Sequence, residues 1–299
     1  MSEHTTLSKA GPLLGAFLLC LSGFGLAGPT SPARADDTSS DQVTPVGVDG
    51  QGNPLEVSPA LAEAATRESA ATEGVVEGYS PDGDTNEKII GPDDRIRFTD
   101  TTEYPNRAIV YIHGADGKQR CTGWLVSPDT VVTAGHCVYN PETQRWNFDV
   151  EYSPGANGAE RPYGTAKATR LWTDNSWIND GNSEQDWGIV KLDRAFPEVG
   201  YFGYRWQSAS FDDTEVQLRG YPQDRPAGEL WGMAGPITES STYNLYYQMD
   251  TVGGQSGSPV FLGDVHRAVA IHTGWEPDDK NRSTRITESL FNIISEIKG

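Results

Sequence analysis

Two short motifs that lie far apart in this chain constrain it more than any other feature, because the fold must bring them together. The first is Thr133-Ala134-Gly135-His136-Cys137, which follows Val131-Val132 and places an imidazole at the end of a predicted strand. The second is Gly253-Gly254-Gln255-Ser256-Gly257-Ser258-Pro259, which holds a serine between glycines and precedes another predicted strand. A serine hydroxyl becomes an effective nucleophile only when a base takes its proton and a third group orients that base. The motifs therefore predict Ser256 as a nucleophile and His136 as its base.

The candidate third group is Asp186, which begins the run Asp186-Trp187-Gly188-Ile189-Val190-Lys191-Leu192. The chain order His, Asp, Ser is that of chymotrypsin-like proteases rather than of subtilisins or α/β-hydrolases. Each residue alone has an ordinary explanation: a buried histidine, a glycine turn and a strand-start aspartate. Together, in this order, they favour catalysis. The long separations favour two β-barrels, the first supplying His136 and Asp186 and the second supplying Ser256.

The glycines beside Ser256 predict a site for a negatively charged oxygen. Glycine adopts backbone conformations that other residues avoid. This freedom allows the amides of Gly254 and Ser256 to point at one position, as an oxyanion hole requires.

Charge excludes one class of partner and divides the chain of 299 residues into two parts. The formal net charge is -19, and no cluster of basic residues opposes it, so nucleic acid is not expected as a partner.

Residues 36–87 carry twelve carboxylates against one basic residue, Arg67, whereas acidic and basic residues are closer to balance from Lys88 onward. Residues 36–87 also lack a stable periodicity and cannot bury enough apolar surface to fold by themselves. We interpret them as a propeptide, extended or partly helical around residues 59–72.

The beginning of the chain resembles an export signal. Residues 11–28 are apolar and uncharged, Lys9 precedes them, and Ala33-Arg34-Ala35 offers small residues for cleavage after Ala35. A permanent membrane anchor is the alternative. We interpret residues 1–35 as a signal peptide and expect a secreted, extracellular protein with no membrane association after its removal.

Two cysteines, Cys121 and Cys137, remain after that removal and flank two predicted strands, residues 122–126 and 130–134. Because an exported protein meets an oxidising compartment, we expect a disulfide between them. It would close a loop of roughly 16 residues and stabilise the fold by about 3 kcal/mol on the loop-entropy model.

Residues 88–299 are expected to form one all-β domain that ends in a helix. Short β-like runs punctuated by turns indicate a sandwich or barrel. The clearest runs are residues 107–112, 146–150, 166–172, 216–220 and 268–272. From Ile286 to Ile297 the apolar residues recur at helical spacing, which predicts a docked amphipathic helix.

The two motifs resemble those of the bacterial glutamyl endopeptidases, which are secreted chymotrypsin-fold proteases that cleave after glutamate. The resemblance extends from about Lys88 to the C-terminal helix. It is carried by residues 90–95, 104–110, 200–204, 247–251 and 281–287, which are similar to Bacillus-type members. It implies two six-stranded antiparallel β-barrels of chymotrypsin type with a C-terminal α-helix, acting on protein or peptide substrates as a monomer.

The resemblance also implies where the substrate glutamate binds. The matching positions are His272, on the strand after the nucleophile, and Thr251, five residues before it. An imidazole and a hydroxyl can both donate hydrogen bonds to a carboxylate. Asp250 offers a rival interpretation, because trypsin-like enzymes place the carboxylate that binds Arg or Lys six residues before the serine. A carboxylate there would repel a glutamate, so we favour His272.

Activation is expected to differ from that of trypsin-like zymogens, because Gln255 precedes the serine where those use an aspartate. The resemblance implies that the mature N-terminus helps offset the substrate's charge. Cleavage after Glu87 would release Lys88 as that terminus, and a glutamate-specific enzyme could make this cut itself.

Further interpretations concern binding without catalysis, metal ions and two histidines. A binding protein that keeps the fold without the chemistry is the non-enzyme alternative. No cofactor is expected; residues 82–86 begin like a calcium loop, but Glu87 stands where the loop needs glycine. A structural calcium elsewhere stays open. His113 and His266 lie outside any motif and are expected at the surface.

Overall fold

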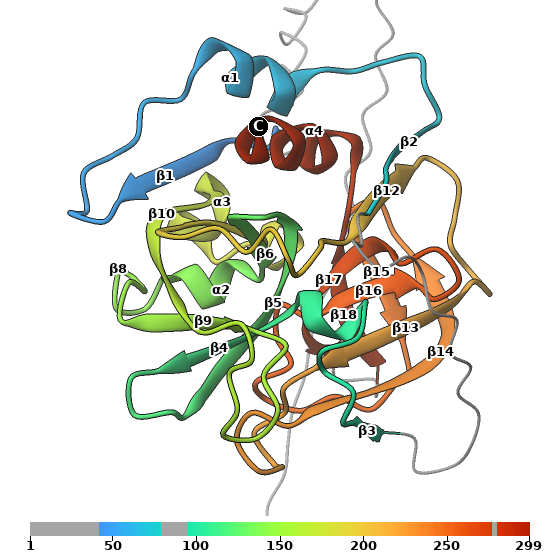
Figure 1. The fold of residues 1–299 in the computed structure, drawn as a ribbon. Helices are drawn as coiled ribbons and strands as arrows, with labels where there is room; N and C mark the ends of the chain where they lie inside the picture. The colour runs from blue at the N-terminus through green and yellow to red at the C-terminus, as the bar shows by residue number, and fades with distance from the viewer. Residues whose placement is uncertain (1–41, 79–94, 277–279) are drawn as a thin grey trace, which may run out of the picture. The chain divides into compact units, whose positions relative to one another are not determined.

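The computed structural model describes residues 42–78, 95–276 and 280–299. These residues form two closed β-barrels, each of six antiparallel strands, as predicted (Figure 1). In the first barrel the order is β10-β11-β6-β5-β4-β9, and a pairing of β9 with β10 closes it. Its strands are β4 (Ile109–Gly114), β5 (Gln119–Ser127), β6 (Thr130–Thr133), β9 (Val150–Pro154), β10 (Ala166–Asp174) and β11 (Gly188–Leu192).

The second barrel has the order β16-β13-β14-β15-β18-β17 and closes through β16 and β17. Its strands are β13 (Glu215–Gly220), β14 (Leu230–Ser240), β15 (Asn244–Tyr247), β16 (Pro259–Leu262), β17 (Arg267–Glu276) and β18 (Lys280–Arg285). Apolar side chains from alternating positions of these strands fill its interior, among them Leu218, Leu245 and Val260.

Short elements connect and flank the barrels. The strand β12 (Gly203–Gln207) follows the first barrel in sequence and runs parallel to the start of β17. The remaining short elements are β3 (Ile96–Phe98), which pairs with β14, the pair β7 (Tyr139–Asn140) and β8 (Arg145–Trp146), the helices α2 (Gly135–Val138) and α3 (Asn175–Asp180), and the 3-10 turns at Asn106–Ala108 and Ser183–Gln185.

The predicted C-terminal helix is present as α4 (Glu288–Lys298). It begins two residues after the predicted start, because the side chain of Thr287 caps it by accepting from the Leu290 amide. Leu290, Ile293 and Ile294 are buried, so the apolar face docks on the domain as expected. No helix within the described ranges has the length and hydropathy needed to cross a membrane.

The acidic segment at residues 42–78 packs onto both barrels and α4 (Figure 1). Its strand β1 (Pro45–Asp49) pairs antiparallel with β10, and its strand β2 (Glu73–Val76) pairs with β12. Between them, α1 (Pro59–Thr66) packs against α4, and Leu61 and Ala65 join the main apolar core. The partly helical character expected near residues 59–72 is therefore present, in a shorter helix. This segment folds by using apolar surface of the rest of the chain.

Two predictions about the described residues were wrong. The strand expected at residues 146–150 is broken, because the Asn147 amide donates to the Val138 carbonyl instead of continuing a ladder. His113 and His266 are buried rather than exposed. The His113 ring stacks on Tyr111 and bonds to the Ser153 hydroxyl, whereas His266 contacts Tyr104 edge to face. The signal peptide, the cut after Ala35, and Glu87 and Lys88 lie outside the described residues.

Candidate active site

His136 and Asp186 are joined by two hydrogen bonds. The Nδ1 atom of His136 lies 2.8 Å from Oδ2 of Asp186, and the backbone amide of His136 donates to Oδ1 at 2.8 Å. Asp186 is only 3% exposed, which strengthens both interactions. The carboxylate therefore fixes the ring orientation and places the ring hydrogen on Nδ1.

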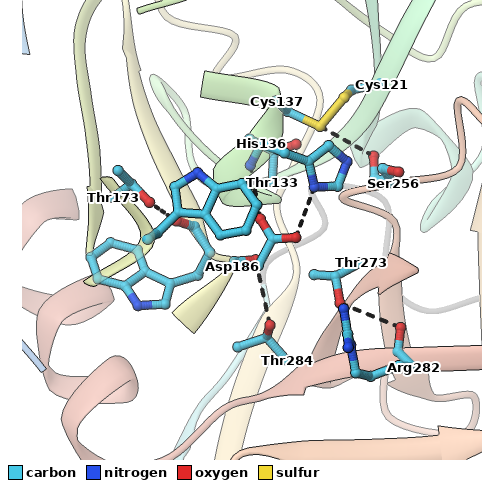
Figure 2. Close-up of polar contacts among 12 residues, drawn as sticks. Cys121, Thr133, His136, Cys137, Thr173, Asp186, Ser256, Thr273, Arg282 and Thr284 are labelled. Carbon is cyan, nitrogen blue, oxygen red and sulfur yellow. Dashed lines mark hydrogen bonds and ion pairs between the residues drawn. A yellow bond between two sulfur atoms is a disulfide. The ribbon is translucent and has the colours of Figure 1, made fainter. Parts of the chain in front are cut away.

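The local sequence explains why these two residues meet. β6 ends at Thr133, and the single turn of α2 turns His136 back toward the start of β11, which Asp186 precedes. Gly135 is required at this turn, because a Cβ there would lie 2.9 Å from Oδ1 of Asp186. The Thr284 hydroxyl of the second barrel donates to the Asp186 carbonyl at 3.4 Å (Figure 2).

Burial and charge act in opposite directions on His136. Burial lowers the pKa of its ring, but the Asp186 carboxylate, through its charge and its hydrogen bond, raises this pKa by more. The net effect is a His136 pKa above its ordinary value. The Asp186 partner therefore strengthens His136 as a base.

Ser256 lies beside the His136 ring, on the side away from Asp186 (Figure 2). The structure thus brings together the three residues predicted from separate motifs. Two backbone bonds hold the serine loop: the Ser256 carbonyl accepts from the Thr122 amide at 2.8 Å, and the Gly257 amide donates to the His272 carbonyl at 2.7 Å. Within the described residues no hydrogen bond joins the Ser256 hydroxyl to the ring. Such bonds are often long before substrate binds.

The expected disulfide joins Cys121 of β5 to Cys137 of α2 (Figure 2). The two Cα atoms lie 6.1 Å apart, and the Cys137 sulfur lies 3.7 Å from the Ser256 carbonyl oxygen. The bridge therefore ties the turn that carries His136 to the strand against which the serine loop rests.

Gly254 is one of the two residues predicted to form the oxyanion hole. Its φ of 95° lies in the region that favours glycine. Its carbonyl faces inward, accepting from the Gln119 side chain at 3.0 Å and from the Thr122 hydroxyl at 2.9 Å. In the part of the chain that the structure describes, the amides of Gly254 and Ser256 donate to no other group. Sequence reasoning missed Gln119 and Thr122, because their contacts arise from strand packing.

Gln255 holds the loop from within. Its Oε1 atom accepts from the Val252 amide at 3.1 Å, and the side chain is fully buried. The position that an aspartate occupies in trypsin-like zymogens is therefore used here for a bond inside the loop.

His272 is buried next to the serine loop, with 3% of its surface exposed. Burial above all, together with the charges of His136 and Arg282, lowers its pKa to about 3, so the ring is neutral. Burial also raises the pKa of Tyr247, whose hydroxyl forms a hydrogen bond of 2.7 Å with Nδ1 of His272. Thr251 is half-buried and Asp250 is exposed. Sequence reasoning gave no role to Tyr247, although its segment carried part of the resemblance.

Comparison with known proteins identifies the family. The family model described as Trypsin matches residues 96–291. A glutamyl endopeptidase of Bacillus licheniformis is 43% identical over 220 residues, which cover 70% of this chain and 69% of the relative. The chain therefore belongs to the trypsin family, in its glutamyl endopeptidase branch. A Staphylococcus aureus glutamyl endopeptidase is 28% identical, with coverage of 70% of this chain and 63% of that one.

Solved structures agree with this membership. The structure titled "Structure of Glu endopeptidase in complex with MPD" matches with a TM-score of 0.64 and 29% identity, covering 71% of this chain and 99% of that one. The protease Anisep of Arthrobacter nicotinovorans, at 19% identity and a TM-score of 0.54, shares the fold and covers 65% of this chain and 98% of that one.

One relative carries a different name. A Bacillus subtilis protein called extracellular metalloprotease is 38% identical over 69% of this chain and 68% of its own length. Within the described ranges, one group of potential metal ligands is Cys121, His136 and Cys137. Metal binding requires free thiolates, but these two sulfurs are bonded to each other, and Nδ1 of His136 donates to Asp186. These residues do not fit a metal centre.

Proposed function

We propose that this chain is a secreted serine endopeptidase that cleaves peptide bonds on the carboxyl side of glutamate, and less well of aspartate. The observation that carries the proposal is the placement of Ser256 beside a histidine held by a buried carboxylate. Membership of the glutamyl endopeptidase branch supports the choice of substrate.

His136 acts as the general base in this proposal. Its unprotonated Nε2 takes the Ser256 proton as the serine oxygen attacks the substrate carbonyl carbon. The imidazolium then gives that proton to the leaving amine, and the C–N bond breaks to leave an acyl-enzyme. Water repeats the sequence and releases the acid. Asp186 stabilises the imidazolium at both stages through the 2.8 Å contact.

The amides of Gly254 and Ser256 stabilise the oxyanion that forms at the substrate carbonyl. Because neither amide has another partner in the described residues, both remain available to the developing charge. Removal of one such donor costs about 3 kcal/mol in related chemistry.

His272 and Thr251 form the proposed glutamate site. In this proposal Tyr247 donates to Nδ1 of His272, which leaves the ring hydrogen on Nε2 for the substrate carboxylate. The rival interpretation gives the site to Asp250, yet that residue is exposed. A silent binding protein would have no need of the oriented His136–Asp186 pair.

The proposed processing divides the chain as 1–35 signal peptide, 36–87 propeptide and 88–299 protease, with cleavage after Ala35 and after Glu87. Among the described residues, no hydrogen bond, strand pairing or ion pair joins residues 42–78 to His136, Asp186 or Ser256. We expect the mature enzyme to act as a monomer without a cofactor.

A peptide library tests the proposal. Mature wild-type protein is expected to cut after glutamate, Ser256→Ala to lose this activity, and His272→Ala to lose it selectively. Cuts after arginine or lysine would transfer the site to Asp250. Absence of cleavage by folded, processed protein would favour the binding-protein interpretation.

A further inference from the structure

Arg282 lies on β18, opposite the strand that carries His272. Its register partner on β17 is Gly274, two residues after His272. The Nη2 atom of Arg282 lies 3.7 Å from the position that a Cβ on Gly274 would take. Figure 2 shows the Arg282 side chain extending toward Thr273, whose hydroxyl donates to the Arg282 carbonyl at 3.4 Å. The guanidinium therefore rests against β17 just beyond His272.

This part of β17 offers a free edge beside the nucleophile. His272 is tied to the serine loop through Gly257 and Ser258. From Gly274 to Glu276, β17 pairs with β18 and with no other strand among the described residues. An extended peptide can pair with a free strand edge. In a substrate paired with this edge, the side chain that precedes the cleaved bond would lie near Arg282.

A substrate carboxylate that enters this site needs a positive partner. Burial of an unpaired carboxylate is costly, and neutral hydrogen bonds offset only part of that cost. His272 is neutral, and Thr251 and Tyr247 supply hydroxyls alone. The charge of Arg282 acts on the proposed glutamate site, because it lowers the pKa of both His272 and His136.

Two nitrogen atoms of the Arg282 guanidinium donate to no group among the described residues. Nη1 is paired with Oε1 of Glu276 at 2.5 Å, and 16% of the Arg282 side chain is exposed. Nε is buried with no partner among the described residues, and Nη2 donates to none of them. Nε and Nη2 together form the side of the fork that binds a carboxylate through two parallel hydrogen bonds.

We propose that Arg282 is a specificity-determining residue that binds the carboxylate of the substrate glutamate through Nε and Nη2, while His272 adds a neutral hydrogen bond. Glu276 tethers the guanidinium from its other side. The inference rests on the proposed function and identifies the source of positive charge in that same site.

Two peptides that differ only in glutamate or glutamine before the cleaved bond test this inference. The mature enzyme is compared as wild type, Arg282→Gln, Arg282→Lys and the exposed control Arg145→Gln, with active sites counted by a phosphonylating probe. Arg282→Gln is expected to lower kcat/KM for the glutamate peptide by about 10- to 100-fold, the value of hydrogen bonds to a charged group. The glutamine peptide and the control should be unaffected.

Each other outcome has one meaning. A wild type that cuts both peptides equally contradicts the proposed function itself. A wild type that prefers glutamate, with an unchanged preference in Arg282→Gln, overturns the role of Arg282 and transfers the charge to another group, such as the mature N-terminus. Equal losses on both peptides indicate a structural role and also overturn it. If Arg282→Gln fails to fold, Arg282→Lys decides, since loss of the fork should lower the preference about fivefold.

Discussion

Asp186 receives two hydrogen bonds from His136, one from the ring and one from the backbone amide, and they end on different oxygens of the same carboxylate. Replacement of that carboxylate by an amide changes both the charge and the ring hydrogen that Asp186 selects. We expect Asp186→Asn to lower kcat about ten-thousandfold with the fold retained. Steady-state kinetics and circular dichroism measure this, and a loss smaller than tenfold would contradict the role of Asp186.

The same pair predicts the acid side of the pH profile. His136 acts only when its ring is unprotonated, so activity falls as the pH drops through its pKa. Because the Asp186 carboxylate raises that pKa, the wild-type activity should fall at a higher pH than that of Asp186→Asn. The pH dependence of kcat/KM for both proteins measures the difference; coincident profiles would refute it.

His272 predicts a dependence of stability on pH. The pKa of its ring is about 3 in the folded protein, whereas an unfolded histidine titrates near its ordinary value of 6.5. Between these values the unfolded chain binds a proton that the folded protein excludes, so stability declines as the pH falls from 6.5 toward 3. We expect His272→Gln to show a shallower decline in Tm over this range. Parallel decline in both proteins would argue against a neutral buried ring.

Gly135 leaves room for the Asp186 carboxylate. The Cβ of an alanine would lie 2.9 Å from both Oδ1 of Asp186 and the Thr173 hydroxyl. We expect Gly135→Ala to displace the pair and lower kcat about a hundredfold. Gly50→Ala is the control, because the nearest atom to its Cβ would be 3.6 Å away. Equal activity of the two variants would show that the site tolerates the shift.

The packing of α1 on α4 predicts a contribution of residues 42–78 to the stability of the precursor. Leu61 is buried in the core shared with Ile293 and Ile294, so Leu61→Ala should cost about 2–5 kcal/mol. Chemical unfolding of the Ser256→Ala precursor avoids self-cleavage and measures this cost. Glu63→Ala, at an exposed position of the same helix, should change the free energy of unfolding little. Equal effects would mean that the helix is not docked in solution.

Sequence reasoning predicted the parts of this protein that depend on local chemistry. Short β-like runs indicated a sandwich or barrel, the separation of the motifs favoured two barrels, and the resemblance implied six strands in each. The C-terminal helix follows from helical spacing, and the Cys121–Cys137 bridge follows from its compartment. The structure also brings His136, Asp186 and Ser256 together. The failures come from contacts between distant segments. His113 is buried because Ser153 supplies a partner for its ring, and the direction of the Arg282 side chain depends on the register of β17 against β18.

The pairing of β1 with β10 has a consequence for the enzyme after maturation. From Arg170 to Thr173, β10 has β11 on one side and β1 on the other. If the propeptide departs, the peptide groups on the second side lose their partners and become a template for another chain. Maturation would thus turn this part of β10 from an internal strand of the sheet into one of its edges.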